Sequence, residues 1–521
     1  MKRQIIIWLV ACLLFGCNSY AQNQANIWYF GYKHGLDFNS GYAEYLDDCP
    51  EWQYYTTSIS DTNGNLLFFT DGQTVWNKER EIMINGEGLH GDRYNPQPAV
   101  ICPDPGNADR YYVFTVGSPD IHKGLEYNII GMALDNGNGS VVTKNVVVPA
   151  GEFAKHKITA VKKANNVDYW IITRFDDPNN PNVWACFSLT ATGLDPIPVI
   201  SPARYSVNAW MQHGAVKVSH DQKKIISVQS GDAGSHGRFD VCNFDIITGE
   251  IDHRFYIKEH NSNPDGFGIY GMEITPDSKL LYISFYAFHQ APLSYLSFVY
   301  QYDLTRTDSL GFLNSRLVVS TDSRASSLQL GPDGKIYVST ISSDPFNSRY
   351  LGVIHNVWER GIFCNYEKNA VDIGVYNGHS GSTLPSFPSE LLYRFVWQGG
   401  PCAKTPFTFR HRFIPEPDSI VWNFGDGTTS TDFNPTHVFQ AGGNYEVHAH
   451  VVYPDGRIEE TSREVEVLAV PEPQMPDTLM LCTGESGQLD AGSGFTQYLW
   501  MGQFTPGNQY YPVTDTGTYT V

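Results

Sequence analysis

Side chains that can bind a ligand recur at one place in a repeated pattern of this sequence, directly ahead of an apolar, strand-like run. Imidazole, amide, amine, guanidinium and aromatic groups suit the binding of a sugar, a peptide carboxylate or a metal ion. The predicted ligand-binding residues are Gln97, His156, Lys157, Trp210, Gln212, His213, Tyr270, Arg324 and His379, with Asn95 and Ser380 beside them. The alternative is that these groups satisfy backbone atoms in a water-filled channel.

Metal coordination is the most specific function that these residue types could serve. Three of them are histidines from separate copies of the pattern, and three histidines are a known zinc-ligand set. Nothing in a single sequence brings the three together, so we predict no metal cofactor. Loops at 135–140 and 176–182 are rich in Asp, Asn and Gly and offer oxygen ligands to calcium, but neither has the spacing of an EF-hand.

Catalytic motifs are absent from the sequence. It contains no G-x-S-x-G, no H-E-x-x-H and no phosphate-binding P-loop. The stretch "SISDTNGNLLF" is weakly similar to the Asp-box of sialidases, but it lacks the Trp expected after Gly64. Asp61 and Gly64 are better interpreted as turn residues, and no catalytic residue is predicted.

The predicted ligand-binding residues lie between copies of one phrase, most plainly "PDSKLLYIS" and "PDGKIYVST". A polar turn with Asp, Asn or Gly precedes about four β-forming residues that end near Ser or Thr. Six copies, roughly 55 residues apart, end at Thr70, Thr115, Thr173, Val228, Ser284 and Ser339. Further β-runs before and after each copy complete a four-stranded meander, the blade unit of a propeller.

The predicted fold is therefore all-β, with a seven-bladed β-propeller over 25–398. Six blades cover about 50–360, and the seventh combines 382–397 with the N-terminal strand at 25–32, which closes the ring. Six or eight blades remain alternatives. Ligands are expected at one mouth of the central channel, where the loops into the innermost strands meet.

A second domain is predicted at 402–469, where alternating strands are separated by Gly, Asp, Asn and Pro turns. The stretch "WNFGDGTTSTDFNPTHVF" resembles the signature of polycystic-kidney-disease (PKD) domains. The resemblance implies a β-sandwich in which Trp422, Phe424 and Tyr445 belong to the core. Such modules act as spacers or contact surfaces more often than as catalysts.

A third unit is predicted at 475–521, after the Pro-rich linker "VPEPQMP". Its Cys482, Trp500 and "GTYTV" resemble the immunoglobulin-like modules of bacterial surface proteins, and we expect a truncated β-sandwich. The seven cysteines after residue 21 form no C-x-x-C pair, which suits scattered buried thiols or one or two disulfides.

Composition restricts the partners. Aromatic residues make up 14% and charged residues 17%, and a net charge of −20 argues against nucleic acid and anionic membranes as partners. Residues 1–21 have a basic start, a short apolar run and a small-x-small cleavage site, as in a signal peptide. Lipoprotein processing at Cys17 is the alternative. No other segment is apolar enough to span a membrane, so we expect an exported protein that is not integral to the membrane.

The order of parts resembles exported surface proteins of gliding bacteria with type IX secretion, on "NIWYFG", "GLDFNSG", "DTNGNLLFFTDGQTVWN" and "MINGEGLHGD". The resemblance implies a secreted or surface-attached protein. We expect binding or adhesion, with the propeller recognising an extracellular polysaccharide or a surface protein and the sandwiches serving as a stalk. A propeller-type hydrolase or lyase is the alternative, and a structural part of an envelope complex is a third interpretation.

Overall fold

The structure is a computed structural model that describes residues 23–519, apart from short gaps. The gaps are 32, 41, 50–54, 118–123, 166, 176–181, 204–213, 230–236, 259–266, 291–292, 322–324, 341–348, 375–383, 389–390, 392–394, 400–401, 412, 414–416, 455, 457, 470–478, 483–484, 493–497, 501–502, 506–508 and 516. Two compact units divide the chain. One comprises Met1–Gln398, Thr408–Pro435 and Glu446–Glu464, and the other Gly399–Phe407, Thr436–Tyr445 and Val465–Val521.

Antiparallel meanders form most of the first unit. The first meander has three strands, β1 (Ile27–Phe30), β2 (His34–Asp37) and β3 (Glu44–Leu46). The next two are β4 (Thr57–Ser60), β5 (Leu66–Thr70), β6 (Thr74–Asn77) and β7 (Ile82–Glu87), then β8 (Ala99–Asp104), β9 (Asn107–Val116), β10 (Leu125–Gly131) and β11 (Ser140–Val147). A parallel contact of β11 with β7, at Ser140 and Ile84, joins these two into one eight-stranded sheet.

Four further meanders follow in chain order. One has five strands, β12 (Ala154–Lys162), β13 (Tyr169–Phe175), β14 (Val183–Thr190), β15 (Gly193–Leu194) and β16 (Val199–Pro202), the last two both pairing with β14. The next is β17 (Val216–Val218), β18 (Lys224–Gln229), β19 (Arg238–Phe244) and β20 (Ile251–Lys258). The last two are β21 (Phe267–Ile274), β22 (Leu280–Gln290), β23 (Leu293–Asp303) and β24 (Leu317–Ser320), then β25 (Ala325–Leu330), β26 (Ile336–Thr340), β27 (Tyr350–Ile354) and β28 (Tyr366–Asp372).

Short helices occur only in connections among the described residues: η1 (Asp135–Gly137), α1 (Ser309–Asn314) and η3 (Gly361–Cys364). The side chain of Asp308 caps α1 by accepting a hydrogen bond from the Gly311 N–H at 2.7 Å. No helix in the described ranges is long and apolar enough to cross a membrane.

The second strand of each of the six meanders after the first carries the repeated phrase, as the sequence predicted. These strands contain buried apolar runs because neighbouring sheets cover both of their faces; all seven residues of β13 are buried. The separate cores between consecutive sheets contain aromatic residues such as Phe114, Phe175 and Phe239.

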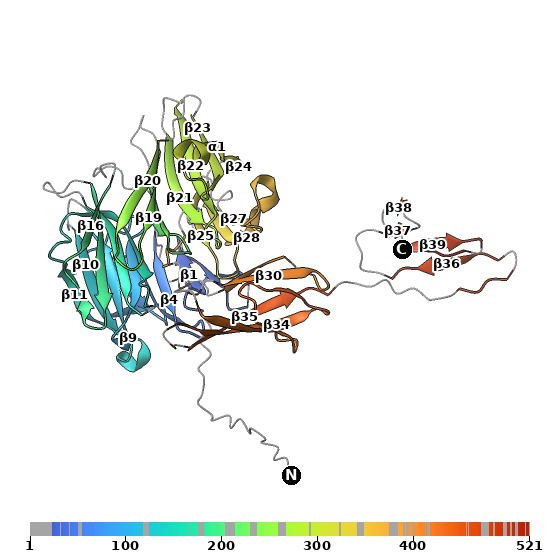
Figure 1. Ribbon diagram of the computed structural model, residues 1–521, viewed down its shortest axis with the longest axis horizontal. Helices are drawn as coiled ribbons and strands as arrows, with labels where there is room; N and C mark the ends of the chain where they lie inside the picture. The colour runs from blue at the N-terminus through green and yellow to red at the C-terminus, as the bar shows by residue number, and fades with distance from the viewer. Residues whose placement is uncertain are drawn as a thin grey trace, which may run out of the picture. The chain divides into compact units, whose positions relative to one another are not determined.

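The meanders follow one another in chain order, and the last packs against the first (Figure 1). The first strands contact their neighbours: β4 with β8, β8 with β12, β12 with β17, and β21 with β25. The ring of Trp28 in β1 meets the ring of Tyr337 in β26 edge-on, with centroids 5.6 Å apart. The chain therefore brings its N-terminal strand back to its last meander.

The repeated Asp folds the turn between the first and second strands. Asp277 accepts hydrogen bonds from the Thr275 hydroxyl at 2.7 Å and from the Lys279 N–H at 3.2 Å. The next residue has a left-handed backbone, with φ of 59° at Ser278 and 83° at the equivalent Gly334. Asp61 likewise accepts from backbone N–H groups, as at Asn63 (2.8 Å). The interpretation of these residues as turn formers is confirmed.

The Ser or Thr that ends the repeated phrase joins the second strand to a bulge in the first strand by a hydrogen bond. The Ser284 hydroxyl accepts from the Gly271 N–H at 2.9 Å, where the register of β21 shifts. Ser339 accepts from the Ser327 N–H at 3.0 Å at the corresponding shift in β25. A bulge leaves backbone groups outside the ladder, so a hydroxyl at this position completes the hydrogen bonding.

The predicted seventh blade is wrong in its strand composition. β1 is completed by β2 and β3, whereas the described residues of 382–397 add no strand to that sheet. The end of this segment belongs instead to β29 (Phe395–Gly399), which pairs with β30. Phe387 still packs beside Trp28, with ring centroids 5.9 Å apart, so its apolar residues were correctly assigned to this core but not to a strand.

The predicted PKD region contains two sheets. One is β29, β30 (Pro406–His411) and β33 (Thr436–Val438); the other is β32 (Thr429–Ser430), β31 (Ser419–Asn423), β34 (Gly443–Val452) and β35 (Ile458–Val467). Trp422 and Phe424 are buried against Phe409. The ring of Tyr445 stacks on Phe439 at 4.3 Å. The aromatic signature residues thus serve the core, as predicted.

The C-terminal region has two short sheets, β36 (Gly487–Asp490) with β39 (Tyr510–Val513), and β37 (Tyr498–Trp500) with β38 (Gln503–Thr505). Trp500 is buried in a small core with Leu489 and Val513. The seven described cysteines form no disulfide, and five of them are buried, which supports scattered thiols over the predicted disulfides.

Candidate functional site

Each meander has two chemically different ends. Because neighbouring strands are antiparallel, the first strand begins at the end where the second strand finishes. We call this the loop end; the connection 88–98 between β7 and β8 lies there. The opposite end, the turn end, holds the tight turns between first and second strands, such as 275–279 between β21 and β22, together with longer connections such as 304–316 between β23 and β24. Of the predicted ligand-binding residues, Gln97 lies just before β8 and Lys157 near the start of β12, so both belong to the loop end.

Gln97 is one predicted residue whose side chain the structure describes. Its amide forms a two-way clamp with the backbone of Val216: Nε2 donates to the carbonyl at 2.9 Å, and Oε1 accepts from the N–H at 2.8 Å. Gln97 is buried and joins the start of β8 to the start of β17, two meanders further on. It therefore satisfies the backbone, as the alternative interpretation states.

Lys157, in β12, is the other predicted residue with a described side chain. Its ammonium group is fully buried and donates to the Val228 carbonyl in β18. The pKa of Lys157 is lowered to about 7. Burial is the main cause and the nearby Arg174 contributes to the lowering, whereas Asp240 opposes it. Lys157 thus links two meanders and does not face solvent.

The other predicted residues are not placed by the structure. His156 and Tyr270 lie in β12 and β21, but their side chains fall outside the described residues. Outside the described residues altogether are Trp210, Gln212, His213, Arg324, His379 and Ser380. The three-histidine arrangement therefore stays a prediction. Within the described ranges no group of three or more His, Cys, Asp or Glu side chains is arranged to hold a metal ion.

Sequence reasoning missed a buried polar network that joins three first strands. Lys217 in β17 donates to Glu273 in β21 at 2.7 Å and to Gln329 in β25 at 2.9 Å. Glu273 also accepts from the backbone N–H groups of Leu330 (2.7 Å) and Ile274 (2.9 Å). A signal was present, because Lys217, Glu273 and Gln329 occupy the same position of successive repeats, where polar residues interrupt apolar runs.

A second buried cluster lies between the β12–β16 and β17–β20 sheets. The Arg174 guanidinium lies 3.6 Å from the Asp240 carboxylate and 4.6 Å above the Trp184 ring. His253 Nε2 lies 3.3 Å from the same carboxylate. Burial raises the pKa of Asp240, although Arg174 and His253 oppose the shift. Arg174 and Asp240 are fully buried, so this cluster joins two sheets and offers no surface to a ligand.

The best-described part of the loop end is formed by two connections, 71–73 after β5 and 88–98 before β8. They are held together by backbone bonds, such as Gly91 N–H to the Gly72 carbonyl at 2.9 Å. A side chain on Gly72 would meet the Pro98 carbonyl at 2.8 Å, so this close approach requires glycine. Arg93 donates to the buried Asp71 carboxylate at 2.6 Å.

This pair sets the electrostatics of the loop end. Burial raises the pKa of Asp71, while Arg93 and two backbone N–H groups lower it. Asp71 is 2% exposed and the Arg93 side chain 34% exposed, so the cation faces outward with its charge balanced from within. Tyr94, the next residue, is 55% exposed. The site thus presents hydrogen-bond donors and an aromatic ring with little net charge.

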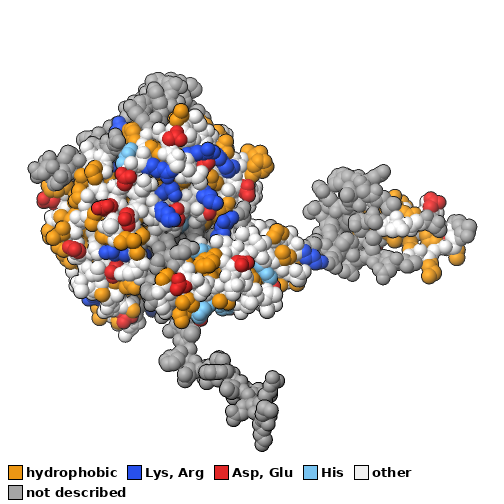
Figure 2. Space-filling model, viewed as in Figure 1, with side chains coloured by type: hydrophobic (Ala, Val, Ile, Leu, Met, Phe, Trp, Pro, Cys, Tyr) orange, Lys and Arg blue, Asp and Glu red, His pale blue; other side chains and the backbone are white. Residues whose placement is uncertain are grey.

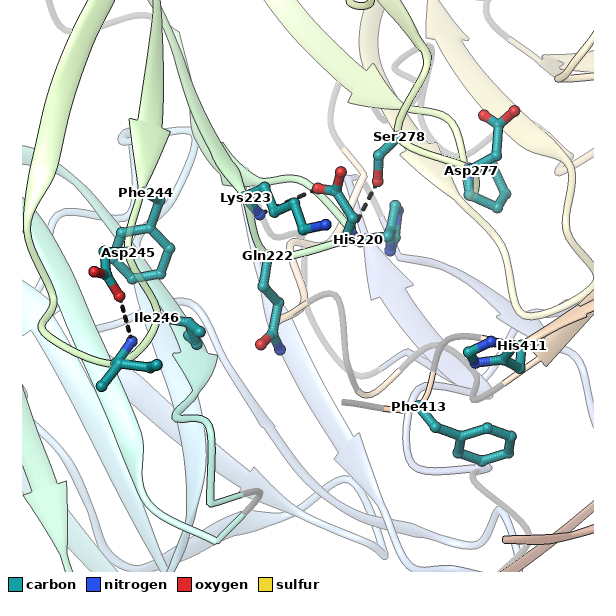
Figure 3. A pocket seen from close by; sticks show the side chains of 13 residues that line it. His220, Gln222, Lys223, Phe244, Asp245, Ile246, Asp277, Ser278, His411 and Phe413 are labelled. Carbon is teal, nitrogen blue, oxygen red and sulfur yellow. Dashed lines mark hydrogen bonds between the residues drawn. The ribbon is translucent and has the colours of Figure 1, made fainter. Parts of the chain in front are cut away.

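The turn end contains a hollow of about 640 Å³ (Figure 3). It is lined by His220, Asp221, Gln222, Lys223, Phe244, Asp245, Ile246, Ile247, Pro276, Asp277, Ser278, His411 and Phe413. Its carboxylates already serve their own turns; Asp245, for example, accepts from the Ile247 N–H at 2.8 Å. The hollow therefore has the size of a ligand site. Its carboxylates are committed, whereas the buried Gln222 Oε1 has no hydrogen-bond partner among the described residues.

Basic side chains of the repeated turns are also committed. Figure 2 shows Lys and Arg side chains gathered on the face in view, although the chain carries a net charge of −20. Lys224, Lys279 and Lys335 pair with the Asp of their own turns at 3.4, 3.7 and 3.2 Å. Such exposed pairs add little stability, but they neutralise the turns locally.

Comparison with known proteins identifies one part of the chain. Residues 400–467 match the family model described as "PKD domain", which confirms the predicted PKD domain. A 60-residue stretch is 43% identical to Collagenase ColA of Bacillus cereus, covering 12% of this chain and 6% of the collagenase. The chain therefore spans only a small fraction of that curated relative.

Two solved structures are similar to parts of this chain. The PKD1 domain of the Vibrio cholerae metalloprotease PrtV is similar at 24% identity over 14% of this chain and 91% of that one, with a TM-score of 0.13. The β-propeller domain of Cps50 (Swd1) from Myceliophteria thermophila is similar at 7% identity over 61% of this chain and 94% of that one, with a TM-score of 0.34. Likenesses this low carry no argument about function.

Proposed function

We propose that this chain is an exported binding protein in which a seven-bladed β-propeller recognises an extracellular polysaccharide or a surface protein through its loop end. The observation that carries the proposal is the contrast between the two ends of the meanders. Turns between first and second strands at the turn end are short and bonded to their own Asp side chains, as at Asp277, whereas the connection 88–98 at the loop end is longer and exposes Tyr94. Binding residues concentrate on loops held by a rigid scaffold.

The PKD domain and the immunoglobulin-like module act as accessory spacers in this proposal. The match of residues 400–467 to the PKD domain model and the similarity to a protein named as a collagenase support export of this chain. The contacts that remain proposed for the ligand are His156, Trp210, Gln212, His213, Tyr270, Arg324 and His379. Gln97 and Lys157 form hydrogen bonds within the scaffold, and neither is proposed to contact the ligand.

A binding assay on the full chain tests the proposal. Affinity electrophoresis with a panel of neutral and acidic polysaccharides, together with pull-down from bacterial surfaces, should show retention by at least one polysaccharide or one surface protein. No retention in either assay would overturn the proposal. Attachment of surface partners in fixed stoichiometry would favour the envelope-complex interpretation instead.

An extracellular hydrolase is the second candidate, favoured by the similarity of the PKD region to a collagenase. The similarity covers only 6% of that protein, so in this candidate function the propeller would have to supply the catalytic groups. Incubation with gelatin and with the same polysaccharides distinguishes the two functions. Release of peptides or reducing ends with turnover would support the enzyme, whereas retention without products supports the binding protein.

A further inference from the structure

We propose that the connection 88–98 forms a subsite for an uncharged sugar residue, with Tyr94 as the stacking surface and Arg93 and Asn95 as hydrogen-bond donors. The inference rests on the proposed function and deepens it, because it selects a neutral polysaccharide as the ligand. Only Asn95 of these three residues stood out in the sequence, as a neighbour of Gln97.

Two donor groups in this connection have no acceptor among the described residues. Asn95 is 1% exposed; its Oδ1 accepts from the Gln97 N–H at 3.2 Å, but its Nδ2 has no acceptor among the described residues. Arg93 Nε is likewise buried and has no acceptor in the part of the chain that the structure describes, although Nη2 of the same side chain binds Asp71. An unsatisfied buried donor is unfavourable, so an arriving acceptor is favoured.

Buried polar atoms without partners also occur elsewhere in the chain, so these two alone do not define a site. What distinguishes this connection is that both donors lie within three residues of each other and flank an exposed aromatic side chain. The Tyr94 ring is 55% exposed, whereas most aromatic rings of the meanders are buried. Aromatic faces provide large apolar contact at low conformational cost, which suits the C–H face of a sugar ring.

The charges point to a neutral ligand. The Asp71 carboxylate lies 2.6 Å from Arg93 and already balances the guanidinium. A second carboxylate at the same place, as in a uronic acid, would be repelled by Asp71. Hydroxyl groups accept hydrogen bonds from Arg93 and Asn95 without that repulsion.

The connection is held in place before any ligand arrives. Gln97 clamps its end to Val216, and the Asn95 N–H donates to the Asp92 carbonyl at 2.9 Å. Pro96 and Pro98 fix their own backbone φ angles on both sides of Gln97. A site built in advance loses less conformational entropy on binding.

Affinity electrophoresis and calorimetry of the full chain with laminarin, xylan and alginate test the inference. We expect retention by laminarin or xylan and none by alginate. Tyr94→Ala should weaken binding at least tenfold and Asn95→Ala about fivefold, whereas Tyr94→Phe should retain it. Tyr42→Ala is the matched control, because Tyr42 is 51% exposed but lies outside this connection. Unchanged thermal unfolding shows that each variant still folds.

The outcomes separate this inference from the proposed function. If the wild-type chain binds laminarin or xylan and Tyr94→Ala binds equally well, the subsite is wrong and the proposed function stands. If only alginate binds, the neutral-ligand inference is overturned. If no polysaccharide binds but a surface protein does, the subsite is again overturned, while failure of both overturns the proposed function as well.

Discussion

The turn end and the loop end of the meanders use polar side chains in opposite ways. At the turn end, the Asp of each repeat, such as Asp277, accepts hydrogen bonds from its own turn, and neighbouring lysines pair with it. At the loop end, the buried donors Arg93 Nε and Asn95 Nδ2 have no acceptor among the described residues, and Tyr94 is exposed. The carboxylates of the repeated turns are thus committed to their own turns, whereas these two loop-end donors are left for a ligand.

Between the two ends, buried polar groups join the first strands. Glu273 accepts from Lys217, Leu330 and Ile274, so this carboxylate belongs to the scaffold although it is charged and buried. A buried polar side chain between two first strands is therefore not by itself evidence of a binding site. What separates a scaffold group from a binding group is whether its partners are already present.

Removal of the Glu273 charge should have the largest effect on stability. Glu273→Ala removes the carboxylate that pairs with Lys217 and leaves two backbone N–H groups without their acceptor, and breaking a buried pair costs about 3–5 kcal/mol. Urea unfolding should show this loss in the free energy of unfolding. Glu367→Ala is the control, since Glu367 is 58% exposed and should change stability by less than about 0.5 kcal/mol. Equal stabilities would show that the network is not structural.

A smaller effect should appear in the pH dependence of stability. The pKa of Lys157 is about 7 in the folded chain, against about 10.4 for an unfolded lysine. Between these values the unfolded chain binds the additional proton, so the free energy of unfolding rises with pH, by roughly 2 kcal/mol from pH 7 to 9. Unfolding at several pH values should show a shallower rise for Lys157→Met. If the free energy of unfolding rose equally with pH in the wild-type chain and in Lys157→Met, burial of the Lys157 ammonium group would be contradicted.

The smallest of these effects on stability concerns the Ser284 hydroxyl, which forms a hydrogen bond with the bulge of β21. Ser284→Ala leaves the buried Gly271 N–H without an acceptor and should cost about 1–2 kcal/mol. Ser140→Ala is the control, because the Ser140 hydroxyl makes only an exposed contact of 3.4 Å and should change little. Binding of polysaccharide should be unchanged in both variants. A change in binding by Ser284→Ala would remove the distinction between scaffold and site.

The sequence predicted the strands and turns well because local chemistry determines them. The Asp, the left-handed residue and the β-forming run of "PDSKLLYIS" act within a few residues, and the PKD motif is equally local. The seventh blade was predicted wrongly for the opposite reason. Apolar side chains such as Phe387 reach the core without forming a strand, and composition alone does not distinguish the two.

The candidate site was harder to predict, because it depends on which groups find partners. Gln97 and Lys157 look like ligand residues in the sequence, yet their partners are the Val216 and Val228 backbones, far along the chain. Arg93 and Tyr94 gave no repeated signal, since their connection occurs once. Whether a polar side chain finds a hydrogen-bond partner depends on the three-dimensional fold, and its residue type alone does not show this.

Hydrogen–deuterium exchange of the full chain, with and without a polysaccharide that it retains, tests the central claim most directly. We predict that slowed exchange on binding is confined to loop-end connections, among them 71–73 and 88–98. Connections at the turn end, such as 220–223 and 275–279, should exchange at the same rate in both states. Protection of the turn-end connections around the hollow, with none at the loop end, would contradict the account.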